Sequence, residues 1–156
     1  MSVDIRPVTK DNWRELIKLK VRDDQKNFVV TNEHSIAESQ FGYDDPEYGH
    51  WDMYPFGIYD NQLPVGFLMY GFNFSQPNSQ AFIIRLMVDE SQQGKGYGRS
   101  AMKWMIKHFR ADDRIQAVGI SYEPENEVAR KLYADLGFVE TGEMSFGEVV
   151  AVLQLK

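Results

Sequence analysis

The chain has 156 residues, a length that supports one domain and is too short for two independent cores. Hydrophobic residues make up 43% and charged residues 26%, values close to those of an average globular protein, so the composition excludes a disordered or fibrous chain. The 17 Lys and Arg residues against 23 Asp and Glu residues give a net charge of −6. This balance argues against nucleic acid or an anionic membrane as a partner, because both bind to a basic face.

The sequence contains no cysteine, which excludes a disulfide framework, a cysteine nucleophile and a thiolate metal site. No stretch approaches the roughly 18 apolar residues needed to span a bilayer, and residues 1–7 lack the apolar region of a signal peptide. The histidines have no ligand-like spacing to one another or to carboxylates; they are His34, His50 and His108. We therefore expect a cytoplasmic protein without a metal and without a membrane partner.

The first half of the chain predicts short helices and strands joined by polar turns. Apolar residues at helical spacing predict helices at residues 13–21 and 34–41. Strand patterns occur at residues 3–8, 56–59 and 65–74, with turns at 60–62 and 75–80. Gly66 and Gly71 lie inside a strand, where glycine indicates a bulge or the close approach of another segment. Residues 42–49 predict a polar, aromatic loop.

The second half predicts strands that alternate with amphipathic helices. Residues 81–88 are almost wholly apolar, as expected for a strand covered on both faces. Two further strands are predicted at 115–122 and 149–155. The buried stripe of one helix is Ala101, Met102, Met105, Ile106 and Phe109, and that of the next is Val128, Ala129, Leu132, Tyr133 and Leu136. Gly137 is placed to end the second helix. The pattern predicts a mixed α/β fold and a single domain spanning residues 1–156.

Between the apolar strand and the first of these helices lies a loop with three alternate glycines, Gly94, Gly96 and Gly98. Such glycines let a ligand approach the backbone, and the unpaired N–H groups at a helix N-terminus form an anion site suited to a pyrophosphate. A tight turn without a ligand is the alternative interpretation. The spacing excludes a P-loop and the G-x-G-x-x-G dinucleotide fingerprint.

Two motifs, in order, resemble those of the Gcn5-related N-acetyltransferases (GNAT). Gln93, Gly96 and Gly98 match the acyl-CoA signature Q/R-x-x-G-x-G/A of that family. A second segment resembles N-x-x-A-x-x-L-Y-x-x-x-G-F, with the matching residues Asn126, Ala129, Leu132, Tyr133, Gly137 and Phe138. The resemblance is clearest over residues 65–156. Within the family, residues 64–71, 93–96 and 142–148 look most like the bacterial spermine/spermidine acetyltransferases.

The resemblance implies the GNAT fold, a mixed central sheet whose splayed parallel strands hold acetyl-CoA. In such a fold the pantetheine arm pairs with backbone groups around Leu86, Met87 and Val88. The pyrophosphate binds at the glycine loop, which implies cofactor-binding residues Gln93, Gly94, Lys95, Gly96, Tyr97, Gly98 and Arg99. Asn126 is implied to hold the arm from the other side. A solvated helix start is the alternative for the two cations, and a helix N-cap is the alternative or additional role of Asn126.

The resemblance also implies the reaction, transfer of an acetyl group from acetyl-CoA to a primary amine, most closely a polyamine such as spermidine or spermine. Tyr133 is the expected acid that protonates the departing thiolate. Outside this motif, a tyrosine on an apolar helical stripe would be read as a core residue. The rival interpretations are a different acceptor (an aminoglycoside, an amino acid or a protein N-terminus) and an acyl-CoA-binding module without catalysis. A homodimer through the exposed C-terminal strand is a further expectation.

The base that deprotonates the amine is not evident from the motifs. Relatives that act on polyamines often carry an acidic residue on the central strand, where this sequence has Ile84 followed by Arg85. The replacement candidates are Glu33, Asp52 and Glu123, for each of which a surface carboxylate is the alternative. The acidic and aromatic residues between 43 and 52 have two interpretations, a solvated loop and a segment that attracts an oligocation.

Overall fold

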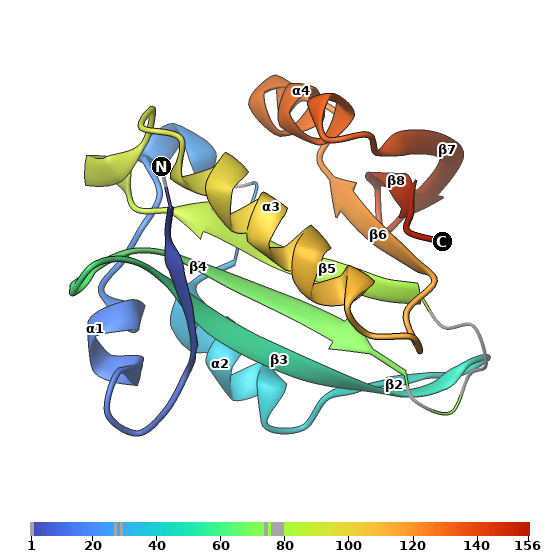
Figure 1. The fold of residues 1–156 in the computed structure, drawn as a ribbon, viewed down its shortest axis with the longest axis horizontal. Coiled ribbons are helices and arrows are strands. Elements are labelled where there is room, and N and C mark those ends of the chain that lie inside the picture. Colours follow the sequence, from blue (N-terminus) through green and yellow to red (C-terminus); the bar gives the residue numbers. More distant parts are fainter. Residues whose placement is uncertain (1, 27, 29, 74, 76–79) are drawn as a thin grey trace.

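The computed structural model describes residues 2–26, 28, 30–73, 75 and 80–156. Its strands form a mixed sheet in the order β1-β3-β4-β5-β6-β8-β7, with β2 paired to β3 outside this path (Figure 1). The strands are β1 (Asp4–Pro7), β2 (Tyr43–Asp45), β3 (Gly49–Asp60), β4 (Leu63–Phe72), β5 (Gln80–Val88), β6 (Ala117–Tyr122), β7 (Val139–Ser145) and β8 (Glu148–Gln154). The mixed α/β class predicted from the sequence is confirmed.

Helices cover both faces of the sheet (Figure 1). They are α1 (Trp13–Ile17), α2 (Asn32–Ser39), α3 (Tyr97–Arg110) and α4 (Glu127–Asp135), with 3-10 turns at Asp23–Gln25 and Glu90–Gln92. The larger core cluster joins α3 and α4 to one face, and a smaller cluster around Phe67, Met69 and Met87 packs the α2 side. The apolar stripe predicted for α3 is buried along its whole length. Burial of this face, rather than helix propensity alone, holds α3 against the sheet.

Gly137 ends the last helix as the sequence predicts. Its φ of 100° lies in the left-handed region, which glycine adopts without strain. The N–H of Phe138 donates to the Tyr133 carbonyl, and the N–H of Gly137 donates to the Ala134 carbonyl, both at 3.0 Å. This pair of bonds is a Schellman motif. It fixes the end of α4 and with it the turn that carries Tyr133.

Gly66 confirms the prediction of a close approach inside a strand. A Cβ atom there would lie 2.5 Å from the Met87 carbonyl oxygen and 3.0 Å from Ile58 Cδ1. No side chain fits in this space, so glycine lets β4 and β5 lie side by side with Ile58 packed over them.

The prediction from the sequence was wrong at several places in the fold. It began a strand at residue 56, although β3 starts at Gly49. It missed β7, whose residues are exposed almost throughout and include no alternating apolar face. It assigned residues 42–49 to a loop, although β2 pairs there with the start of β3. It extended the first helix to residue 21, whereas α1 ends at Ile17 and the Lys20 N–H donates instead to Asp89 Oδ1 at 2.9 Å. Residues 74 and 76–79, where a strand end and a turn were predicted, lie outside the described residues.

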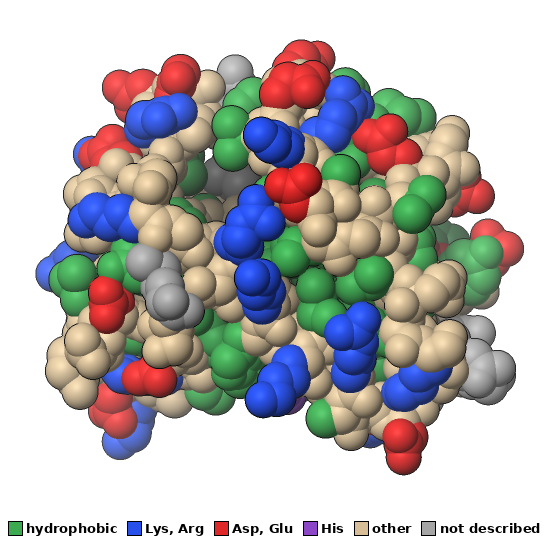
Figure 2. All heavy atoms as spheres, turned by 45° about the horizontal axis from the view of Figure 1, so that its top comes forward, with side chains coloured by type: hydrophobic (Ala, Val, Ile, Leu, Met, Phe, Trp, Pro, Cys, Tyr) green, Lys and Arg blue, Asp and Glu red, His purple; other side chains and the backbone are tan. Residues whose placement is uncertain are grey.

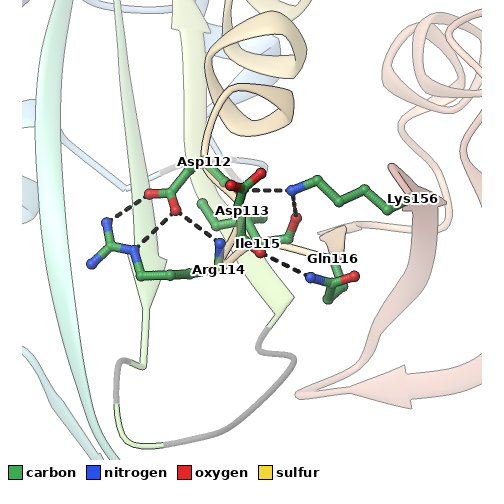
Figure 3. A network of polar contacts seen from close by, with 6 residues as sticks. All are labelled: Asp112, Asp113, Arg114, Ile115, Gln116 and Lys156. Carbon is green, nitrogen blue, oxygen red and sulfur yellow. Dashed lines mark hydrogen bonds and ion pairs between the residues drawn. The ribbon is translucent and has the colours of Figure 1, made fainter.

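A polar network holds the turn that joins α3 to β6 (Figure 3). The Asp112 carboxylate accepts from the backbone N–H of Arg114 at 3.0 Å and from its guanidinium at 2.9 and 2.6 Å. Lys156 Nζ donates to the carbonyl oxygens of Asp112 and Ile115 at 2.6 and 2.9 Å. The C-terminal residue therefore ties down the entry into β6.

We expect Asp112→Asn to destabilise the protein at neutral pH. The hydrogen bond and charge of Arg114 lower the pKa of Asp112 to about 2. A carboxyl group whose folded-state pKa is lowered stabilises the fold above its unfolded pKa and loses that contribution as pH falls through about 2. Because the pair is partly exposed, the loss at pH 7 is about 1 kcal/mol. Urea titrations at pH 7 and near pH 2 measure it, and Asp113→Asn is the matched control. An equal effect of the two variants would contradict the prediction.

Candidate active site

The central feature of the site is a gap between β5 and β6. The two strands pair in parallel only from Gln80 opposite Ala117 to Ile83 opposite Ile120. Beyond that point β5 continues beside β4, β6 continues beside β8, and the strand ends diverge (Figure 1). A β-bulge lies at the same point, because Ile84 is the extra residue between the partners of Met69 and Tyr70 on β5. A bulge bends its strand and increases the local twist, which explains why the sheet opens there.

Backbone groups of β5 face this gap. The Asp89 N–H donates to the Val65 carbonyl at 2.8 Å, which fixes the alternation of the antiparallel ladder with β4. Met87 shares the orientation of Asp89 and directs its N–H and carbonyl toward β4. Leu86 and Val88 direct theirs to the opposite edge. Of the three strand residues predicted to bind the cofactor arm, two therefore direct backbone groups to the gap, where the Val88 carbonyl accepts from Gln93 Nε2. The Met87 side chain packs on the far face of the sheet.

The glycine loop forms the start of α3. Gly94 and Gly96 have φ values of 78° and 89°, and Gly96 is the N-cap residue. Within the described residues, no side chain caps the helix, so N–H groups of its first turn remain available. The helix dipole favours negative charge at this end. An amide-lined N-terminus of this kind can hold a diphosphate group.

A cavity of about 670 Å³ runs from the glycine loop to the gap and to α4. Most of the predicted cofactor-binding residues line it: Leu86, Met87, Val88, Gln93, Gly94, Gly96, Tyr97, Gly98, Arg99 and Asn126. The sequence motifs, distant in the chain, are thus brought together around one cavity. Figure 2 shows Lys and Arg side chains gathered across the middle of one face, although the chain as a whole is acidic.

The predicted polar side chains differ in how they are held. Gln93 Nε2 donates to Gln25 Oε1 at 2.8 Å and to the Val88 carbonyl at 3.0 Å, so this side chain fixes the loop. Arg99 forms an ion pair of 3.1 Å with Asp135 on α4.

Lys95 and Tyr97 point elsewhere. Lys95 is absent from the wall of the 670 Å³ cavity and lines a neighbouring hollow of about 410 Å³ beside α3. Tyr97 is 5% exposed and its hydroxyl donates to Asp60, so its side chain belongs to the core. From Tyr97 only the backbone N–H is suited to an anion.

Asn126 begins α4 in the manner of an N-cap. Its side-chain oxygen accepts from the Ala129 N–H at 3.2 Å, which confirms the alternative role considered from the sequence. The same residue also lines the cavity, so the structural role does not remove it from the site.

Tyr133 lies where the gap meets α4. Its side chain is 7% exposed, and its ring lies 5.5 Å from that of Tyr122 and 5.9 Å from that of Phe138. Within the described part of the chain, no hydrogen bond to its hydroxyl is found. Burial raises the pKa of Tyr133, and Tyr122 and the carboxylate of Glu148 raise it further. The phenol is therefore held protonated, as a proton donor must be.

A second cavity, of about 300 Å³, reaches Tyr133 from the α2 side of the sheet. It shares Leu86, Asn126 and Tyr133 with the first cavity, so the two meet at the gap. Its own wall carries the charged and polar side chains Lys26, Arg85, Ser121, Glu123 and Glu148. A molecule in each cavity would meet the other beside the phenol of Tyr133.

Arg85, which lines this second cavity, forms an ion pair with Glu38 of α2. Arg85 Nη2 lies 3.3 Å from Glu38 Oε1, and Nη1 donates to the Ile84 carbonyl at 3.0 Å. Its Nε atom is buried without a partner among the described residues. Burial lowers the pKa of Arg85 from its usual value.

The structure separates the candidate bases. Glu123 lines the second cavity, and so does Ile84, the residue of the β-bulge. Glu33 and Asp52 line neither cavity, and Asp52 instead lies 3.4 Å from His50 Nε2. The sequence analysis did not single out Ser121 or the role of Glu148. The segment 142–148 was noted only as a resemblance, and the pairing of β8 with β6 is what brings these two residues together.

Among the described residues, no group of three or more His, Asp or Glu side chains is arranged to hold a metal ion. In the same part of the chain, no helix has the length and apolar character required to cross a bilayer.

The open parallel strand pair, the uncapped glycine turn and the buried phenol define a protein of the acyl-CoA N-acyltransferase class. The sequence profile described as the acetyltransferase (GNAT) family matches residues 13–138, which is most of the chain. The chain therefore belongs to the GNAT family and is an N-acetyltransferase that uses acetyl-CoA as its co-substrate.

The chain is similar to known members along its whole length. It is 30% identical over 160 residues to a spermine/spermidine N(1)-acetyltransferase of Bacillus subtilis (strain 168), covering 99% of this chain and 100% of the relative. Its fold matches an acetyltransferase from Thermus thermophilus (TM-score 0.69, 18% identity, 99% and 98% of the two chains covered). It also matches the PaiA N-acetyltransferase from Thermoplasma acidophilum in complex with coenzyme A (TM-score 0.68, 15% identity, 99% of each chain covered).

Proposed function

We propose that this enzyme transfers the acetyl group of acetyl-CoA to a primary amine of a polyamine such as spermidine or spermine. The observation that carries the proposal is the full-length similarity to the B. subtilis spermine/spermidine acetyltransferase. The carboxylates of Glu123 and Glu148 in the second cavity support it, because they are suited to a cationic acceptor.

In this proposal acetyl-CoA occupies the larger cavity. Its pyrophosphate binds the N–H groups at the start of α3 between Gly94 and Arg99, and its pantetheine arm pairs with the free edge of β5 at Leu86 and Val88. Asn126 holds the arm from the α4 side. This placement brings the thioester to the gap beside Tyr133.

The amine reaches the thioester from the second cavity. The nitrogen forms a bond to the acetyl carbon, a backbone N–H near Val88 stabilises the negative carbonyl oxygen, and the carbon–sulfur bond breaks. Tyr133 donates its phenolic proton to the departing sulfur. The absence of another hydrogen-bond partner among the described residues leaves this proton free for the thiolate.

The acidic segment around β2 supports a polycationic acceptor. The pKa of Tyr48 is raised mainly by Glu47, and also by Asp45 and by Glu143 of β7. The negative charges of β7 and of this segment therefore lie close enough to affect the same side chain, Tyr48. Such a local negative field raises the concentration of an oligocation near the surface.

One observation favours a second acceptor class. Arg85 borders the second cavity with an Nε donor that has no partner among the described residues, which suits an acceptor that carries a carboxylate beside its amine. An amino acid meets this description.

An amine panel separates these acceptors. We expect thiol release from acetyl-CoA to be fastest with spermine and spermidine, slower with the shorter putrescine, and slowest with alanine and with a peptide bearing a free N-terminus. Mass spectrometry of the products identifies the acetylated nitrogen. If turnover is faster with the amino acid or the peptide than with the polyamines, the polyamine is not the preferred acceptor.

We also propose that the chain acts as one domain and forms a homodimer. One sheet runs from β1 to β7 through the described residues, which supports the single domain. The expectation that the C-terminal strand is an exposed edge is wrong, because β8 pairs with β6 on one side and β7 on the other. The edge strand is β7, and the large apolar side chains exposed on it and on the adjoining turn are Val139, Met144 and Phe146. Light scattering of the purified protein would measure twice the chain mass for a dimer. The cytoplasmic location stays a prediction.

A further inference from the structure

The acceptor must lose a proton during the reaction, and the sequence motifs supply no group to accept it. Two of the carboxylates near the second cavity differ in their surroundings. Glu38 is engaged by Arg85 at 3.3 Å. Glu148, the first residue of β8, has one oxygen in contact with a hydroxyl group, because its Oε1 atom accepts from Ser121 Oγ at 2.7 Å.

We propose that Ser121 and Glu148 form the proton-accepting pair of this acetyltransferase, with Ser121 receiving the proton of the amine and passing its own proton to Glu148. The inference rests on the proposed function and identifies a further catalytic residue, Ser121, and a residue that acts through it, Glu148.

The position of the pair supports this role. Ser121 and Glu148 come from neighbouring strands, β6 and β8, on the wall of the second cavity, and Tyr133 closes the same cavity from α4. Because Ser121 Oγ uses its hydrogen toward Glu148, its lone pairs are available to accept a proton from a molecule in the cavity. An acid and a proton acceptor then lie around one reacting amine, as aminolysis of a thioester requires.

Electrostatics link the two sides of the site. The charge of Glu148 contributes to the raised pKa of Tyr133. Ionised Glu148 therefore keeps the phenol protonated while it remains available to accept a proton itself. Glu148 thus acts on Tyr133 through its charge and, in this proposal, on the amine through Ser121.

The proton balance closes without another reactant. The lone pair of the free amine forms the carbon–nitrogen bond, and one N–H proton passes to Ser121 Oγ as the Ser121 proton passes to Glu148 Oε1. The electron pair of the carbon–sulfur bond goes to sulfur, which takes the Tyr133 proton. Glu148 is then neutral and Tyr133 is a phenolate, and proton exchange with solvent restores both. Amine and thioester have become amide and thiol.

The test compares single variants of the purified enzyme with acetyl-CoA and spermidine. We expect Glu148→Gln to lower kcat about 100-fold or more, the effect of removing one positioned proton acceptor, while the Kd for acetyl-CoA stays unchanged. Ser121→Ala lowers kcat about tenfold, because water replaces the hydroxyl less well. Glu33→Gln, an exposed carboxylate of α2 that lines neither cavity, is the control and keeps the wild-type rate.

Two readouts separate proton transfer from a structural role. The first is the pH profile of kcat, whose shape we expect to differ between the wild-type enzyme and Glu148→Gln if this carboxylate takes part in proton transfer. The deficit of Glu148→Gln also shrinks with weakly basic amines, because their adducts lose a proton readily to water. A structural defect would lower the rate equally at every pH and for every amine.

A wild-type kcat in Glu148→Gln would contradict the proposed roles of Ser121 and Glu148. A loss of kcat in Glu123→Gln instead of Glu148→Gln would contradict them as well. If Glu148→Gln does not fold, an unchanged kcat in Ser121→Ala overturns them, and a reduced kcat with intact acetyl-CoA binding supports them. If the wild-type enzyme acetylates another amine but not spermidine, the proposed polyamine acceptor is refuted. The roles of Ser121 and Glu148 are then tested by comparing the same variants with the amine that is acetylated.

Discussion

Replacing Tyr133 with phenylalanine is expected to lower kcat by about 10² to 10³ and to leave the acetyl-CoA Kd within about twofold of the wild-type value. The substitution removes only the hydroxyl group. The ring contacts with Tyr122 and Phe138 remain, and no hydrogen-bond partner among the described residues is left unsatisfied. Steady-state thiol release measures kcat, and calorimetric titration with acetyl-CoA measures binding.

Tyr59→Phe is the matched control for this experiment. Tyr59 is also buried, at 1% exposure, but its hydroxyl donates to Glu15 at 2.5 Å and it lines neither cavity. We expect Tyr59→Phe to lower stability by about 1 kcal/mol through the lost hydrogen bond and to keep kcat. A Tyr133→Phe enzyme with near-wild-type turnover would show that another group protonates the thiolate.

The parts of the fold that were predicted correctly are those whose signal lies in adjacent residues. The apolar stripe of α3 repeats at helical spacing, and each of its five residues is buried. Gly137 was placed correctly because a left-handed C-terminal residue is a local requirement. β7 escaped prediction for the same reason, since its exposed residues carry no local pattern and its position is set by pairing with β8.

The candidate site also has one half that local sequence patterns predict and one half that they do not. The half that we propose binds the pyrophosphate lies within the continuous segment 93–99, so the glycine spacing alone predicts it. The half that we propose faces the amine is built from contacts between distant residues. Glu148 meets Ser121 across 27 positions and Arg85 meets Glu38 across 47. These contacts depend on the order of strands in the sheet, which no local pattern contains.

The bulge at Ile84 connects the two halves. It ends the pairing of β5 with β6 and so opens the gap through which both cavities reach Tyr133. A departure from regular strand geometry thus creates the opening at which we propose that the reaction takes place. Ile84 itself carries no charge, and among the described residues the carboxylates that line the second cavity are those of Glu123 and Glu148.

Gly96→Val is expected to raise the Kd for acetyl-CoA at least about 100-fold, which corresponds to about 2.7 kcal/mol of binding free energy. At a φ of 89°, valine is strained, because a β-branched residue rarely adopts the left-handed region. The loop is then expected to shift away from its present backbone path. The N–H groups at the start of α3 would no longer converge on one point, and the pyrophosphate would lose them together.

Gly142→Val separates this effect from strain alone. Gly142 has a similar φ of 86°, and no atom of the described residues lies within 4 Å of the position that its Cβ would take. It lies on β7, away from both cavities. We expect Gly142→Val to lower the thermal unfolding temperature about as much as Gly96→Val and to leave the acetyl-CoA Kd unchanged, because only the Gly96 substitution displaces the amides that face the diphosphate. Equal affinities of the two variants would mean that the phosphate groups bind somewhere other than the glycine loop.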